Sequence, residues 1–341
     1  MKKIVAIIAM ALVLVSCDHK DLWVLGEPAE ENVIVKLHYV LEWHRPYVVA
    51  DSVEKWLYWI DDWPAGLACD SDSLCPRHPR YCRMVTESGN RQMMSIFDGD
   101  EGRAGALTAG MNMLFYNIDT EYIVYKDKDK LSTLTASTNL ADGSLSAVAN
   151  VDSLGDEAVY KQPDVVFSSK IVSFSDSVLR NDTLHVVLKP LVWSYVVEVD
   201  INENLDKVRR ARGYMTRLAK SVKVAEHATN DDTMTVGFSM NVCRAGVCAI
   251  VKSFGIPRYN PDSPTLPPAP GCRLIVVLTL TNGRTVTQKW NIDNQMLAQP
   301  AGGVITPGAM TIPKDSLVGG NAGFDVDVDG WGDPHNYNLD L

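Results

Sequence analysis

The sequence predicts an all-β protein made of two tandem β-sandwich domains with little helix. Short apolar runs alternate with polar residues at period two, as in part of residues 33–43, and turn residues separate one run from the next. Almost no stretch shows the longer apolar periodicity of a helix. This pattern is typical of sandwiches and differs from the strand and helix alternation of α/β enzymes.

Several further strands are expected in both halves of the chain. They cover residues 55–63, 111–117, 122–125, 165–174, 184–188, 191–201 and 235–242. The clearest hairpin is residues 274–290, in which Asn282 and Gly283 lie between two alternating runs. These two residues predict a type I′ turn, in which both have positive φ.

One segment departs from the strand pattern. Apolar residues recur at helical spacing in residues 205–222, with six basic residues elsewhere around the segment. The spacing favours a helix packed on a sheet with a solvated charged face, and a basic helix lying on an anionic membrane is the alternative. Gly213 inside the segment weakens the case for one continuous helix. The proline-rich residues 256–271 are expected to form an extended loop.

The N-terminus resembles a bacterial lipoprotein signal. Lys2 and Lys3 precede an apolar run that is too short for a permanent membrane span, and Leu14-Val15-Ser16-Cys17 follows as a lipobox. We expect cleavage before Cys17 and lipidation of that cysteine, which tethers the protein to the outer membrane at the cell surface. The predicted domains are then a signal peptide at 1–17 and sandwiches at 18–190 and 191–341.

Charge and motifs exclude several classes of function. The formal net charge is −10, and removing Lys2 and Lys3 takes it to −12, which argues against nucleic acid as a partner. The sequence contains no nucleophile elbow, no phosphate-binding glycine loop and no paired metal-binding histidines. We therefore expect no enzyme and no cofactor, although carboxylates converging from distant strands would leave a hydrolase possible.

Six cysteines besides Cys17 suit an oxidising compartment. Disulfides are the favoured use of these thiols, and a zinc site near His78 is the alternative. An odd number in each half implies either a bridge between the halves or free thiols. The candidates are Cys69, Cys75, Cys82, Cys243, Cys248 and Cys272.

The C-terminal residues 324–333, FDVDVDGWGD, begin like a calcium-binding loop. A glutamate is missing where such a loop needs its last ligand, so no metal is expected. Phe324, Val326 and Val328 instead alternate with aspartates, as on a strand with one buried face. This strand is a candidate for strand exchange with a neighbour, and closure of its own sheet is the alternative.

Four stretches together resemble an uncharacterised lipoprotein family of Bacteroidota related to the FimA/Mfa-like fimbrillins. They are residues 17–22, 112–125, the hairpin that leads to Trp290, and residues 323–331. The resemblance implies two transthyretin-like sandwiches, and fimbrial subunits as partners through strand exchange. In stalk subunits of that kind a protease cuts after an arginine and removes the first strand, and a neighbour's strand fills the groove.

This chain differs from the stalk pattern in two places. Its first arginine after Cys17 is Arg45, and Pro46 follows it, which disfavours cleavage. The cysteine-rich loop at residues 69–82 is not part of the family pattern. The sequence therefore predicts an anchor or accessory subunit of a pilus or adhesion structure that keeps its first strand. A monomeric lipoprotein that binds glycans or proteins is the alternative, with Trp56, Trp59 and Trp63 as its aromatic residues.

Overall fold

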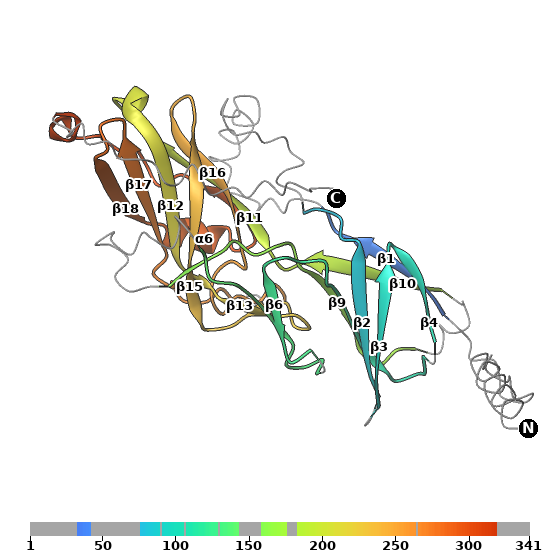
Figure 1. The fold of residues 1–341 in the computed structure, drawn as a ribbon. Coiled ribbons are helices and arrows are strands. Elements are labelled where there is room, and N and C mark those ends of the chain that lie inside the picture. Colours follow the sequence, from blue (N-terminus) through green and yellow to red (C-terminus); the bar gives the residue numbers. More distant parts are fainter. Residues whose placement is uncertain are drawn as a thin grey trace, which may run out of the picture.

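A computed structural model describes residues 33–41, 76–88, 91–105, 107–128, 130–142, 158–175, 183–263 and 265–318. Strands dominate the described ranges (Figure 1), and the all-β prediction is confirmed. The single α-helix within them is α6 (Asp293–Ala298), and two short 3-10 helices are η2 (Leu205–Lys207) and η3 (Lys314–Leu317).

Within the described residues, the first half of the chain supplies ten strands. They are β1 (Val33–Tyr39), β2 (Tyr81–Ser88), β3 (Arg91–Asp98), β4 (Glu101–Ala104), β5 (Asn112–Asn117), β6 (Ile123–Lys126), β7 (Thr135–Thr138), β8 (Val159–Tyr160), β9 (Phe167–Ile171) and β10 (Thr183–Pro190).

The second half supplies the other nine strands of the described ranges. They are β11 (Trp193–Asp200), β12 (Val208–Ala219), β13 (Ser221–Lys223), β14 (Ala228–Thr229), β15 (Thr233–Val242), β16 (Gly246–Ser253), β17 (Arg273–Leu280), β18 (Thr285–Asn291) and β19 (Gly303–Ile305).

The first sandwich is a sheet in the order β3-β2-β5-β9-β10-β1-β4, which folds over on itself at β10. Most of β10 pairs with β1, whereas its last two residues, Lys189 and Pro190, pair with β9. The two layers enclose one apolar core that includes Val35 of β1, Val186 of β10 and Phe115 of β5. Exposed and buried residues alternate along β10, as its alternating sequence predicts for a strand with one face toward solvent and one toward the core.

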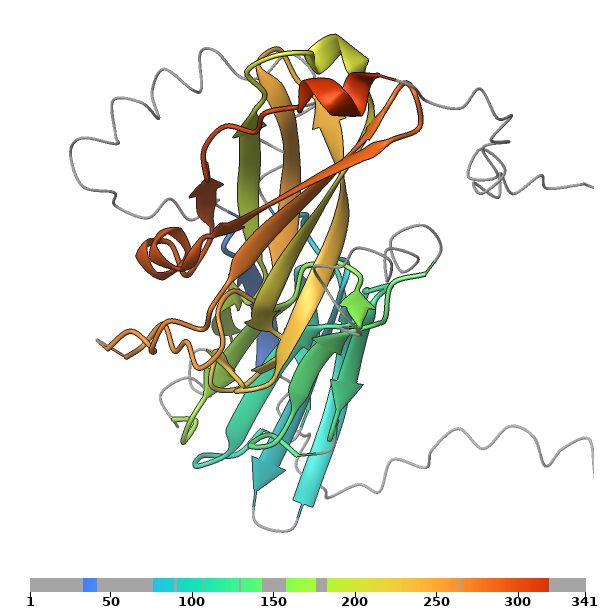
Figure 2. The same ribbon diagram turned by 90° about the vertical axis from the view of Figure 1, so that its left-hand side faces the viewer.

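The second sandwich has the order β18-β17-β12-β15-β16-β11-β19, and β15 likewise changes layers near its end. Two segments of the first half join strands of the second: β7 pairs with β13, and β8 pairs with β15. Figure 2 shows the two groups of strands stacked along the molecule. The predicted domain boundary at 190/191 lies between β10 and β11, and it stays a prediction.

The predicted helix at 205–222 is wrong, because most of the segment is the central strand β12. Two β-bulges explain the helix-like spacing. Across one of them, Met215 and Leu218 pair with Val236 and Met234, so three steps on β12 match two on β15. The extra residue changes which face the later side chains occupy.

The second bulge lies at the start of β12, where Val208 pairs with Leu280 and Arg210 with Thr279. Together the two bulges bring Val208, Ala211, Met215 and Leu218 onto one core. Apolar residues spaced three and four apart therefore lie on one face of a bulged strand in this segment. Sequence periodicity alone cannot distinguish this arrangement from a helix.

Replacing Gly213 with alanine distinguishes a strand from a helix here, because the two predict opposite changes in the free energy of unfolding. In an exposed helix the change would stabilise the protein by about 1 kcal/mol. In β12 an added Cβ would overlap the buried ring of Phe238, so we expect a loss of about 1–3 kcal/mol in the free energy of unfolding. Urea denaturation measures it. Adding Phe238→Leu should recover part of the loss, whereas stabilisation by Gly213→Ala would contradict the strand.

The hairpin of β17 and β18 is confirmed, but its turn differs from the predicted type I′. Gly283 has φ of 80°, whereas Asn282 is absent from the described non-glycine residues with positive φ. Leu280 and Arg284 close the loop through a backbone hydrogen bond of 2.8 Å. Three loop residues with one left-handed glycine at the end form the other common hairpin connection.

A buried polar contact links β9 to the turn after β13. The Ser168 hydroxyl donates to the Val224 carbonyl at 2.7 Å and lies 2.9 Å from Nε2 of His227. Burial, with a smaller contribution from Lys189, lowers the pKa of His227, while Asp262 opposes the shift. Folding therefore favours the neutral imidazole.

A lowered pKa in the folded state predicts the direction of the pH dependence. The stability that His227 contributes is complete above its unfolded pKa of about 6.5, and it is lost as the pH falls toward the folded value. Urea denaturation at pH 7.5 and 5.5 should show this loss. His227→Asn, which tolerates the left-handed backbone at this position, should reduce it. An unchanged pH slope would contradict the assignment.

Candidate functional site around the N-terminal strand

Strand β1 is paired on both of its edges. It runs parallel to β10, with Ile34 opposite Thr183 and Tyr39 opposite Leu188, and antiparallel to β4. Parallel partners need a long connection, and more than 100 residues lie between β1 and β10 in the sequence. The first described strand is therefore an interior strand of its sheet.

The side chains of β1 alternate between the core and the solvent. Val33, Val35 and Leu37 are 2%, 0% and 3% exposed. Full burial of a residue of this size contributes roughly 1.5–3 kcal/mol. Removing β1 would open a groove between β10 and β4 lined by the core, so the strand is a structural part of the first sandwich.

The end of β1 is held by a ring cluster. The Tyr39 ring lies edge-on to Phe167 at 5.2 Å and to His78 at 4.8 Å between centroids. The next backbone amide, of Val40, donates to the Leu188 carbonyl at 2.9 Å. Burial, followed by the nearby Cys82, raises the pKa of the Tyr39 phenol. Tyr39 thus fixes the point where the chain leaves β1.

The segment before β2 fastens to the acidic turn between β3 and β4. His78 Nε2 lies 3.1 Å from Asp100 Oδ1, and the Arg80 guanidinium donates to both oxygens of Asp98 at 2.9 and 3.2 Å. This hydrogen bonding lowers the pKa of Asp98. The backbone N–H of Arg80 also donates to Asp119 Oδ2 at 2.6 Å. These contacts hold residues 76–80 over the end of β1.

The same acidic turn reaches β1 directly. Lys36 Nζ lies 3.7 Å from Glu101 Oε2. Leu37 N–H donates to the Asp100 carbonyl at 2.7 Å. The carboxylates at 98–101 therefore act as structural partners of nearby cations, as expected for a surface turn. Exposed pairs of this kind contribute about 1 kcal/mol or less each, so the core holds β1 more strongly than the charges do.

Most of the predicted site residues lie outside the described residues. These are Cys17, Cys69, Cys75, Phe324, Val326 and Val328, together with Trp56, Trp59 and Trp63. Nothing in the structure tests the lipid anchor, the aromatic residues or the strand-exchange segment.

The other cysteines divide into one disulfide and two free thiols. Cys243 and Cys248 are joined across the turn between β15 and β16. Cys82 and Cys272 are free and buried. Burial is the main reason that the pKa of each thiol rises to about 12, so both stay protonated at neutral pH. The sequence alone gave no pairing.

Two kinds of feature are absent from the described ranges. There, no group of three or more histidine, cysteine, aspartate or glutamate side chains is arranged to hold a metal ion. No helix among them is both long and apolar enough to cross a bilayer.

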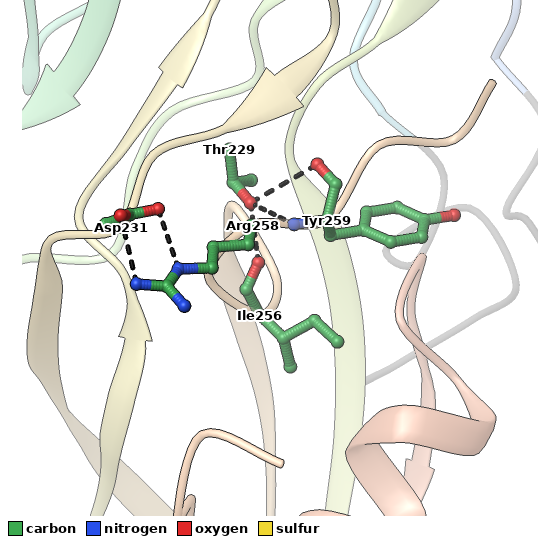
Figure 3. A network of polar contacts seen from close by, with 5 residues as sticks. All are labelled: Thr229, Asp231, Ile256, Arg258 and Tyr259. Atoms are coloured by element: carbon green, nitrogen blue, oxygen red, sulfur yellow. Dashed lines mark hydrogen bonds and ion pairs between the residues drawn. The ribbon is translucent and has the colours of Figure 1, made fainter. Parts of the chain in front are cut away.

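The proline-rich loop at 256–271 projects from the second sandwich (Figure 2) and is pinned at its base. Thr229 Oγ1 donates to the Ile256 carbonyl at 2.7 Å and accepts from the Tyr259 N–H at 2.8 Å. The Arg258 guanidinium binds both oxygens of Asp231 at 2.8 and 3.0 Å (Figure 3). The loop therefore starts from a fixed position.

Sequence reasoning missed both the fastening of residues 76–80 and the base of the proline-rich loop. The signal for the first was present, since the basic His78-Pro79-Arg80 and the acidic Asp98–Glu101 are opposite in charge. Only the fold shows that β2 and β3 bring the two segments together. For the base of the proline-rich loop, no local sequence pattern connects Thr229 with Tyr259.

A family model described as "Domain of unknown function (DUF5119)" matches residues 69–239, half of the chain. No curated protein matches the chain.

Solved structures of similar fold come from Bacteroides and Porphyromonas species. A candidate adhesin of Bacteroides ovatus is 18% identical, with a TM-score of 0.51 over 76% of this chain and 93% of that one. The fimbrial anchor protein Mfa2 of Porphyromonas gingivalis is 9% identical, with a TM-score of 0.42 over 81% of this chain and 90% of that one. The family match and the likeness to the Bacteroides ovatus structure together confirm that the chain belongs to an uncharacterised family with this fold.

Proposed function

The chain belongs to the DUF5119 family, and for this member we propose the role of a surface-anchored, fimbrillin-like adhesion subunit without catalytic activity. Lipid attached at Cys17 holds it in the outer membrane, and fimbrial subunits are its partners. Within such an assembly it serves as an anchor or accessory subunit. The adhesin-like fold and the resemblance of the sequence to fimbrillins support this proposal.

The proposal rests on one observation, which is that β1 is held firmly inside the first sandwich. A stalk subunit must lose its first strand to open a groove for a neighbour's strand. Here β1 has a partner on each edge and three buried side chains, and its end is fastened by Tyr39. Arg45 is the first arginine after Cys17, so cleavage there would remove all of β1, and Pro46 disfavours it. A subunit that keeps β1 has no groove for a neighbour's strand, so a row of strand-exchanged subunits would end at it.

Membrane fractions test the proposal. Unboiled and boiled outer-membrane samples are compared on gels, because strand-exchanged assemblies survive detergent until heating unfolds them. We expect a high-mass band that contains this protein and collapses on boiling. Cys17→Ala should release the protein from the membrane. A single band in both lanes would contradict assembly with other subunits. Retention of Cys17→Ala in the membrane would contradict the lipid anchor.

A monomeric binding lipoprotein is the second candidate, favoured by the proline-rich loop. Its base is fixed by Thr229 and Asp231, and Leu266 along it is 57% exposed. A loop that is held at its base loses less entropy on contacting a partner than a loop that is free at both ends. A monomer that stays on the cell surface and loses binding to glycans or proteins with Leu266→Ser would favour this role.

A further inference from the structure

Two histidines meet on the outer face of the first sandwich. His38 lies on β1 and His185 on β10, and 147 positions separate them in the sequence. The two strands are parallel neighbours (Figure 1), with Lys36 opposite His185 and Val187 opposite His38, so the histidines are diagonal neighbours. Both are exposed on the face opposite the core. The seven histidines are scattered singly along the sequence, so only the fold shows this pair.

The two rings lie edge to edge, with one nitrogen of each directed at the other. His38 Nε2 lies 3.0 Å from His185 Nδ1, the ring planes differ by 16°, and the ring centroids are 5.3 Å apart. The centroid separation exceeds the distance between the nitrogens by about the width of one imidazole ring, which rules out a face-to-face stack. One ring therefore donates its N–H to the unprotonated nitrogen of the other.

The separation of the two nitrogens suits two ligands of one metal ion. A bond from zinc to a histidine nitrogen is about 2.0–2.1 Å long, so two neighbouring ligand nitrogens lie about 2.9–3.4 Å apart. The observed 3.0 Å falls within this range. The nitrogens can keep this separation while the rings turn until both lone pairs point to one position in the solvent. The last side-chain torsion of histidine is broad, so an exposed ring turns at little cost.

The backbone beneath the pair is fixed. The pairing of β1 with β10 runs without a break from Ile34 to Tyr39, and both histidines lie within the paired stretch. The other edge of β1 pairs with β4. A site on paired strands keeps its geometry better than a site on a loop.

The charged groups on this face limit the affinity for a cation without blocking it. Lys36 lies opposite His185, and its ammonium is paired with Glu101 of β4 at 3.7 Å. Arg103 of β4 and Lys189 of β10 are the other cations of this face, and both are exposed. Among the described residues no third histidine, cysteine, aspartate or glutamate completes a group with the pair. Water therefore supplies the remaining ligands.

We propose that His38 and His185 together bind one divalent transition-metal ion. Imidazole suits Zn²⁺, Ni²⁺ and Cu²⁺, and Cu²⁺ should bind most tightly of the three. When the ion binds, the donating ring takes its other tautomer, so that its proton moves to the nitrogen that faces away from the ion.

The bound ion joins β1 to β10 on the face opposite the core. With half as many protein ligands as a structural zinc site, the pair should have a Kd on the order of 1–100 µM. The inference depends neither on the lipid anchor nor on assembly into a pilus.

Calorimetric titration of the untagged full chain with Ni²⁺ tests the pair. The parent chain is compared with His38→Asn, His185→Asn and the double variant. His78→Asn is the matched control, because the His78 ring contacts Tyr39 and Asp100 instead of a second imidazole. We expect one Ni²⁺ that the parent and the control bind alike, and that each single variant binds about tenfold more weakly or less. The double variant should lose no more than a single one.

Two results would overturn the proposal. Equal binding by the parent and the variants of the pair, or no binding by any of them, would mean that the two histidines hold no ion. Loss of binding with only one of the two substitutions would mean that the imidazoles do not act together.

Stability gives an independent readout of the link between the strands. Ni²⁺ at a hundred times its Kd should shift the folding equilibrium of the parent about hundredfold toward the folded state, because the unfolded chain does not hold the two rings together. Urea denaturation with and without Ni²⁺ measures this shift. We expect the double variant to lack it, and an equal shift in the parent and the double variant would contradict the site.

Discussion

Replacing Val35 with aspartate is expected to unfold the first sandwich. Val35 is 0% exposed at the centre of β1, between Leu184 of β10 and Gly102 of β4. The change removes roughly 1.5–3 kcal/mol of apolar burial and places a carboxylate in the core, which costs several kcal/mol more. The sum, about 5 kcal/mol or more, is comparable to the whole stability of a domain.

The measurement is urea denaturation followed by circular dichroism and hydrogen exchange. Lys36→Thr is the matched control, because this neighbour faces solvent and loses only an exposed pair with Glu101. We expect the control to lie within about 1 kcal/mol of the parent chain. Equal, small effects of both substitutions would mean that β1 is not an interior strand, and the argument for its retention would fail.

Asn117→Leu is expected to cost about 3 kcal/mol, because it leaves the buried Phe167 N–H and the partly buried Val165 carbonyl without their partner. The Asn117 side chain accepts from the Phe167 N–H at 2.7 Å and donates to the Val165 carbonyl at 3.0 Å. It is 2% exposed, so water cannot replace these bonds. Asn117 thereby fixes the start of β9 against the end of β5.

Asn112→Leu, at the opposite end of β5, is the matched control. Asn112 accepts from the Ser173 N–H at 3.1 Å in an exposed position, where water can take over the bond. We expect a loss below about 1 kcal/mol for this variant. Denaturation midpoints of the two leucine variants compare the effects directly. A cost at Asn117 no larger than at Asn112 would contradict the buried network.

Strands that alternate regularly could be predicted from the sequence, and so could β5 and β11, which are buried on both faces. β10 and β18 alternate regularly and were expected. β2 was missed, because Met84 and Val85 are neighbours that both lie in apolar cores, on opposite faces of the strand. β12 was mistaken for a helix, because its bulges shift the alternation.

The candidate site depended on features that no local pattern contains. The hydrophobic alternation of β1 was visible, but its parallel pairing with β10 joins residues far apart in the sequence. The position of Tyr39 between Phe167 and His78 likewise follows only from the fold. The sequence shows that no arginine lies between Cys17 and Arg45. Only the structure shows that cleavage at Arg45 would remove an interior strand, β1.

Peptide mass spectrometry of the surface-exposed protein tests the central claim most directly. Trypsin should release residues 21–36, between Lys20 and Lys36, which include the first part of β1. Residues 274–284, between Arg273 and Arg284, give a reference peptide from the same chain. The account predicts equal amounts of the two peptides in the assembled protein. Loss of residues 21–36, with a new N-terminus at Pro46, would show that β1 is removed and would contradict the account.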